Sequence, residues 1–99
     1  MFPPRLQNEQ VDFLCDALVA VGAREEARRL LEDLCTLAEV ESLSQRLVVA
    51  RMLRAGATYQ KIVKETGASS ATVSRVKRCL EDGADGYQTI LAMLEREGR

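Results

Sequence analysis

The stretch "TYQKIVKETGASSATVSRVKRCL", from Thr58 to Leu80, predicts two short helices that meet at a glycine turn. Thr58 is predicted to cap the start of the first helix and Ser69 the start of the second, because hydroxyl side chains accept hydrogen bonds from free backbone N–H groups there. Gly67 lies just past the first helix, where the chain needs a left-handed backbone that glycine adopts without steric cost. This order of elements is typical of a helix-turn-helix.

Apolar residues recur in this stretch at the offsets that two packed helices require. The first helix offers two adjacent apolar residues, a small residue follows the glycine, and the second helix repeats apolar residues at steps of three and four. We expect these side chains to pack between the two helices: Ile62, Val63, Ala68, Val73, Val76 and Leu80.

The opposite face of the second helix is polar and basic, and it carries no acidic residue before Glu81. Hydroxyls in the first turn suit phosphate oxygens and base edges, a small side chain suits a thymine methyl, and lysine and arginine suit phosphates. An ordinary hairpin of a helical bundle is the alternative, although such a helix more often has Glu among its cations. The predicted DNA-contacting residues are Ser69, Ser70, Ala71, Thr72, Ser74, Arg75, Lys77, Arg78, Tyr59, Lys61 and Lys64.

Charge is distributed unevenly along the chain, whose net charge is −1. Residues 1–43 carry four Arg and nine acids, a net −5, and residues 79–99 carry two Arg and five acids, a net −3. Residues 44–78 carry eight Lys and Arg but one acid, a net +7. A basic segment between acidic ends indicates a polyanionic partner, whereas a chance scatter of solvated charges is the alternative.

The rest of the chain also reads as helix, since period-two alternation is absent and apolar residues recur at three- and four-residue steps. Six helices in one domain of 99 residues are predicted, an all-α fold. In the third helix, one face is predicted to hold Leu43, Leu47, Ala50 and Leu53. Its start stays open, because Thr36 with Glu39 and Ser42 with Gln45 both fit a capping box.

Several functional classes are disfavoured by what the sequence lacks. It has no His, no phosphate-cradling loop and no convergent carboxylate pair, so neither an enzyme nor a cofactor is predicted. Three Cys without a C-x-x-C argue against a disulfide framework and a metal site, and Cys79 is expected to be a buried, inert thiol rather than a redox switch. No apolar run spans a bilayer and the N-terminus does not resemble a signal peptide, so the cytoplasm is expected.

Two adjoining segments carry a resemblance to a known family. "LSQRLVVARMLRAG", followed by the stretch quoted first, resembles the Trp repressor superfamily, and in particular its bacterial branch of YerC/YecD-type TrpR-related proteins. The core pattern of that branch matches Glu65–Leu80 and Gly83–Tyr87. The resemblance is dense from Leu43 to Tyr87.

This resemblance implies an intertwined homodimer with a TrpR-like domain over residues 1–99. Residues 7–57 and 87–97 would form the dimer core, and residues 58–81 the helix-turn-helix. Ser69–Arg78 would then enter the major groove of double-stranded DNA, with two half-sites about 34 Å apart. The function expected is a sequence-specific transcription regulator, with repression as the expected sign. A protein–protein adaptor that uses the helix-turn-helix surface is the alternative from another class.

The resemblance also raises the question of a tryptophan corepressor, which two arginines clamp in Trp repressor. Arg46 and Arg75 match those positions. Val76, however, replaces a glycine that lies beside the indole, and the chain is one residue shorter between the third helix and the glycine turn. Direct DNA contact or an ion pair with Glu39 or Glu41 is therefore the favoured role for both arginines. A repressor gated by a small aromatic ligand at Arg46 and Arg75 stays an alternative, and no small-molecule effector is predicted.

Overall fold

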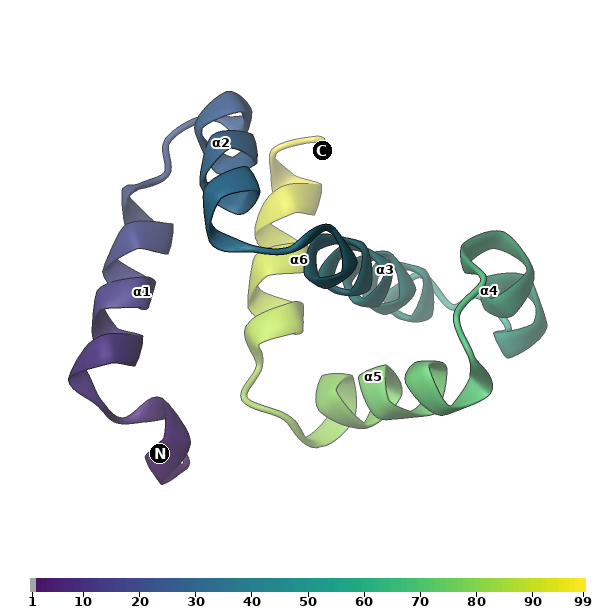
Figure 1. The fold of residues 1–99 in the computed structure, drawn as a ribbon. Coiled ribbons are helices and arrows are strands. Elements are labelled where there is room, and N and C mark those ends of the chain that lie inside the picture. The colour runs from purple at the N-terminus through teal and green to yellow at the C-terminus, as the bar shows by residue number, and fades with distance from the viewer. Residues whose placement is uncertain (1) are drawn as a thin grey trace. The chain divides into compact units, whose positions relative to one another are not determined.

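The computed structural model describes residues 2–99, and all of their regular structure is helical (Figure 1). A short 3-10 helix, η1, precedes six α-helices, which confirms the predicted all-α, six-helix fold. The elements are η1 Pro4–Leu6, α1 Glu9–Ala20, α2 Arg24–Leu34, α3 Leu37–Arg54, α4 Tyr59–Thr66, α5 Ser70–Asp82 and α6 Gly86–Arg96.

The chain divides into two compact units. The N-terminal unit holds α1, α2 and the first turn of α3, and it ends at Val40. The C-terminal unit runs from Glu41 to Arg99 and contains the remainder of α3 with α4, α5 and α6. Along residues 2–99, no helix has both the length and the apolar character that crossing a membrane requires.

A capping box decides where α3 begins. The Thr36 backbone N–H donates to Glu39 Oε1 at 2.8 Å, and the Glu39 N–H donates to Thr36 Oγ1 at 3.1 Å. Hydrogen bonding from Thr36 to the carboxylate, first from its backbone N–H and then from its side chain, lowers the pKa of the Glu39 carboxyl group. The alternative start at Ser42 is wrong, because α3 already begins at Leu37. The Gln45 side chain does not cap the helix but donates to the Thr66 carbonyl oxygen.

The turn between α4 and α5 is built as predicted, with one addition. Thr58 Oγ1 accepts from the Lys61 N–H at 3.2 Å, and Gly67 has a left-handed φ of 71°. The addition is Thr66: its hydroxyl accepts from the backbone N–H that follows Gly67, at 3.1 Å, and its carbonyl accepts from Gln45 Nε2 at 3.1 Å. Gln45 therefore ties α3 to the turn.

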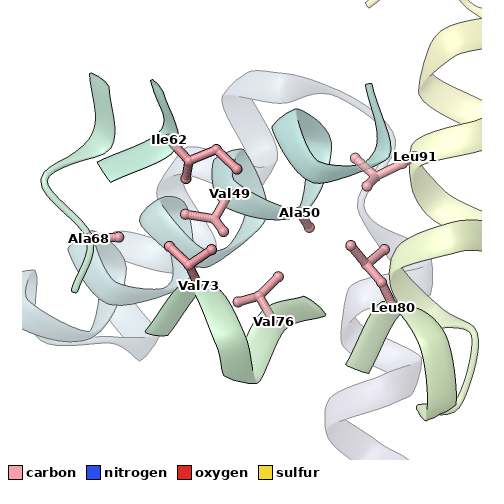
Figure 2. Close-up of a cluster of buried hydrophobic side chains, with 8 residues drawn as sticks. All are labelled: Val49, Ala50, Ile62, Ala68, Val73, Val76, Leu80 and Leu91. Carbon is pink, nitrogen blue, oxygen red and sulfur yellow. The ribbon is translucent and has the colours of Figure 1, made fainter. Parts of the chain in front are cut away.

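One buried cluster holds the C-terminal unit together (Figure 2). Its side chains come from α3, α4, the turn, α5 and α6, so the helix-turn-helix is braced by the helices on either side of it in sequence. The cluster consists of Val49, Ala50, Ile62, Ala68, Val73, Val76, Leu80 and Leu91.

One prediction about this core is wrong, and a second is confirmed only in part. Val63 is 39% exposed whereas its neighbour Ile62 is fully buried, because successive helical residues differ by about 100° in direction and one of them faces the core. Of the predicted face of α3, Ala50 is buried and Leu53 packs against the cluster, while Leu43 and Leu47 are exposed. The second buried residue of this helix is Val49, which was not predicted. That helix is apolar on more than one face, so periodicity did not single out the buried one.

The N-terminal unit has many apolar side chains and none of them is buried in α1 or α2. In α1, Phe13 is 76% exposed and Val19 is 85% exposed. The charged residues of this helix form a narrow acidic row of Glu9, Asp12 and Asp16. A helix that is apolar on most of its circumference is normally covered on several sides.

Candidate nucleic-acid interface

The outer face of α5 is open to solvent. Its inner side supplies the buried Val73, Val76 and Leu80, so the residues between them point outward. Of the predicted DNA contacts, Thr72 is half-buried and all others are exposed: Ser69, Ser70, Ala71, Ser74, Arg75, Lys77 and Arg78 on α5 and its cap, and Tyr59, Lys61 and Lys64 on α4.

Hydroxyl groups fix the start of α5. Ser69 Oγ accepts from the Thr72 backbone N–H at 3.1 Å and donates to Thr72 Oγ1 at 3.0 Å. The predicted cap at Ser69 is thereby confirmed. The end of the helix that carries Ser70 and Ala71 also holds the positive end of the helix dipole, which attracts a phosphate group.

Four basic residues of the interface have no ion pair or side-chain hydrogen bond with any residue from 2 to 99: Arg75, Arg78, Lys61 and Lys64. Lys77 differs from them. Its Nζ lies 3.9 Å from Glu81 Oε1 and 5.6 Å from the centroid of the Tyr59 ring. The surface pair with Glu81 contributes at most about 1 kcal/mol, so a phosphate can replace it.

Arg54 belongs to the basic segment but is not a free cation. Its Nε donates to Glu95 Oε1 at 2.8 Å and its Nη2 to Glu95 Oε2 at 3.3 Å, while Nη1 contacts Gln88 Oε1. Gln88 Nε2 donates to the Leu80 carbonyl oxygen at 3.3 Å. These three side chains, here called the Arg54 clasp, connect α3 and α6 to the end of α5. The sequence did not predict the clasp, because 34 and 41 residues separate Arg54 from its partners.

The clasp should make stability depend on pH. The hydrogen bond from Arg54 lowers the pKa of the Glu95 carboxyl group below its usual 4.5. Because the folded-state pKa is the lower one, the clasp stabilises the protein fully above the unfolded-state pKa and loses this effect as pH falls through the folded-state pKa. We expect Glu95→Gln to weaken the acid dependence of the free energy of unfolding between pH 7 and 3, measured by urea denaturation.

The exposed Glu65, for which residues 2–99 provide no ion pair, supplies the control Glu65→Gln. If Glu65→Gln weakened the acid dependence of the free energy of unfolding as much as Glu95→Gln does, the Arg54 clasp would not be the source of that dependence.

Arg46 and Arg75 are placed on α3 and α5. Arg46 is half-buried, and its buried Nε finds no hydrogen-bond acceptor within residues 2–99. Neither arginine forms the ion pair considered with Glu39 or Glu41 in the part of the chain that the structure describes. Val76 is buried in the core, so its methyl groups fill space on the inner side of α5.

Cys79 is exposed on α5, so the prediction that its thiol is buried is wrong. Val76 and Leu80 take the inward positions on either side of it. Among residues 2–99, no group of three His, Cys, Asp or Glu side chains is arranged to hold a metal ion.

Comparison with known proteins agrees with this architecture. The family model described as "Trp repressor protein" matches residues 9–95. A Bacillus subtilis (strain 168) protein named "Uncharacterized protein YerC" is 52% identical over 87 residues, which cover 88% of this chain and 84% of that protein.

Two solved structures are similar over almost the whole chain. A candidate Trp repressor from Staphylococcus aureus is 46% identical with a TM-score of 0.89, over 96% of this chain and 95% of the other. A TrpR-like protein from Eubacterium eligens ATCC 27750 is 44% identical with a TM-score of 0.87, over 97% and 96%. The match over residues 9–95 and these likenesses confirm the resemblance inferred from the sequence: the chain belongs to the Trp repressor family.

Proposed function

We propose that this protein is a sequence-specific, double-stranded-DNA-binding transcription regulator that acts in the cytoplasm as a homodimer, with repression as its expected effect. The observation that carries the proposal is the outer face of α5, which is cationic, open and braced from behind by the buried cluster. Membership of the Trp repressor family supports a DNA-binding regulator.

Each group on this face has a role in the proposal. Helix α5 enters the major groove, where Ser70, Ala71, Thr72 and Ser74 read base edges and thymine methyl groups. Arg75 and Arg78 bind phosphates, together with the lysines of α4 and α5. Phosphate contacts fix the position of the helix on the duplex, and contacts with base edges supply the sequence preference.

Binding to a duplex of the preferred sequence, selected from a random pool, should weaken steeply with salt. Each phosphate that a lysine or arginine neutralises releases counterions, so the logarithm of the affinity should fall with the logarithm of salt concentration by about 0.9 per neutralised phosphate. The measurement is a fluorescence anisotropy titration at several salt concentrations, with a scrambled duplex as control. A flat salt response, or equal affinity for both duplexes, would refute the proposal.

The exposed apolar surface of α1 and α3 supports the homodimer. Phe13, Leu18, Val19 and Leu47 lie in water in the single chain, and a second copy would cover them. We expect sedimentation equilibrium to give a mass of twice 11.0 kDa. Leu18→Glu should shift the protein toward monomer because it places a charge in the apolar interface.

Gln10→Glu adds the same charge to the first turn of the same helix, at an exposed position that is already polar, and should leave the mass unchanged. A monomeric wild-type protein would contradict the dimer, as would equal dissociation by the two variants.

A second candidate function is repression gated by a small aromatic ligand near Arg46 and Arg75, and the buried Nε of Arg46, which has no acceptor within residues 2–99, favours it. The buried Val76 opposes it, since the family resemblance places this side chain where a glycine leaves room for the aromatic ring of the ligand. Calorimetric titration with tryptophan, tyrosine and phenylalanine separates the two proposals. A heat of binding that is present in the wild-type protein and absent in Arg46→Ala would support ligand-gated repression. No heat of binding with any of the three amino acids would support a regulator without a ligand.

A further inference from the structure

A shallow notch lies where α4 meets the start of α5. Its lining consists of Tyr59, Gln60, Val63, Lys64 and Ser70, and the surface that these residues offer to solvent in the notch is almost entirely apolar. Val63 was predicted to lie in the core, but its side chain is exposed and lines this notch. An apolar hollow is unexpected on a face otherwise made of hydroxyl and cationic groups.

The surroundings of the notch are those of the proposed DNA interface. Ser70 is the first residue of α5, directly after the cap at Ser69. Lys64 lines the notch itself, and the Lys77 ammonium group lies 5.6 Å from the centre of the Tyr59 ring. The chemical group that binds in the notch is therefore apolar, and it belongs to a molecule that carries negative charge close to that group.

We propose that the notch receives the 5-methyl group of one thymine in each half-site, and that Val63 is the residue that determines this specificity. The inference rests on the proposed function. In the major groove, thymine is distinguished from the other bases by an apolar methyl group, and its neighbouring phosphates match the cations around the notch. Burial of one methyl group strengthens binding by about fourfold.

The test replaces thymidine by deoxyuridine, one position at a time, in the selected duplex. Deoxyuridine removes the methyl group and leaves the pairing edge intact. For the wild-type protein, one position per half-site should lose affinity by about fourfold. Val63→Thr has nearly the same shape but puts a hydroxyl in place of a methyl group, and it should reduce that loss to below about twofold at the same position. Deoxyuridine at the other thymines is the internal control.

The outcomes separate this inference from the proposed function. Failure to prefer any duplex would refute both. Sequence-selective binding with no position sensitive to deoxyuridine would overturn the notch alone, as would a selected site without thymine or a loss that is unchanged in Val63→Thr. If Val63→Thr weakened binding to all duplexes equally, the notch would pack against the sugar–phosphate backbone, which also overturns the proposal. Circular dichroism verifies that the variant is folded.

Discussion

Replacing Ile62 with alanine is expected to lower the free energy of unfolding by about 2–5 kcal/mol. Ile62 is among the largest fully buried side chains of the protein, and it lies in the cluster that joins α4 to α3 and α5. Removing three of its carbon atoms loses their transfer free energy and leaves a cavity that the neighbouring helices fill incompletely. Urea denaturation at a fixed protein concentration measures the change, because dimer stability depends on concentration.

Val63→Ala is the matched control for this variant. The two residues are adjacent on the same helix, but Val63 is 39% exposed, so its truncation should cost about 0.5 kcal/mol or less. If the two variants lost equal stability, the orientation of α4 about its axis would differ from the one described. Val63 would then not line the notch, and the thymine inference would fail with it.

The double variant Arg75→Glu with Arg78→Glu should weaken DNA binding by about a hundredfold or more. Each exposed arginine is proposed to make a charge-assisted hydrogen bond to a phosphate, worth about 1.5–3 kcal/mol, and each glutamate adds repulsion. The salt dependence should also become shallower, by about 0.9 for each phosphate that the variant no longer neutralises. Fluorescence anisotropy at two salt concentrations measures both effects.

Arg96→Glu with Arg99→Glu makes the same change in net charge outside α4 and α5, at and just beyond the end of α6 in the same compact unit. It should retain most of the affinity, because exposed charges farther away than about 8–10 Å are largely screened at physiological salt. Equal losses in the two double variants would show that net charge, and not the face of α5, governs binding. The assignment of Arg75 and Arg78 to phosphates would then be wrong.

Local features of the fold could be predicted from the sequence because their causes are local. Thr58 and Ser69 cap helices through hydrogen bonds that span three residues, and Gly67 takes the left-handed turn that its missing side chain allows. The inner stripe of α5 was predictable for the same reason, since three apolar residues at helical spacing stood among polar ones. These features were enough to indicate a helix-turn-helix with a basic outer face.

Only the tertiary structure decided which of several similar apolar residues are buried in the core. Ile62 and Val63 are both β-branched and apolar, and α3 likewise offers Val49 and Leu47 as core residues. Packing between the helices buries Ile62 and Val49 and leaves the other two exposed. The sequence of one helix does not contain this information. The same reason explains Arg54, whose partners Glu95 and Gln88 are brought to it by α6. Spacing along the chain determines which side chains share a helix face, but the direction of that face is set by partners tens of residues away.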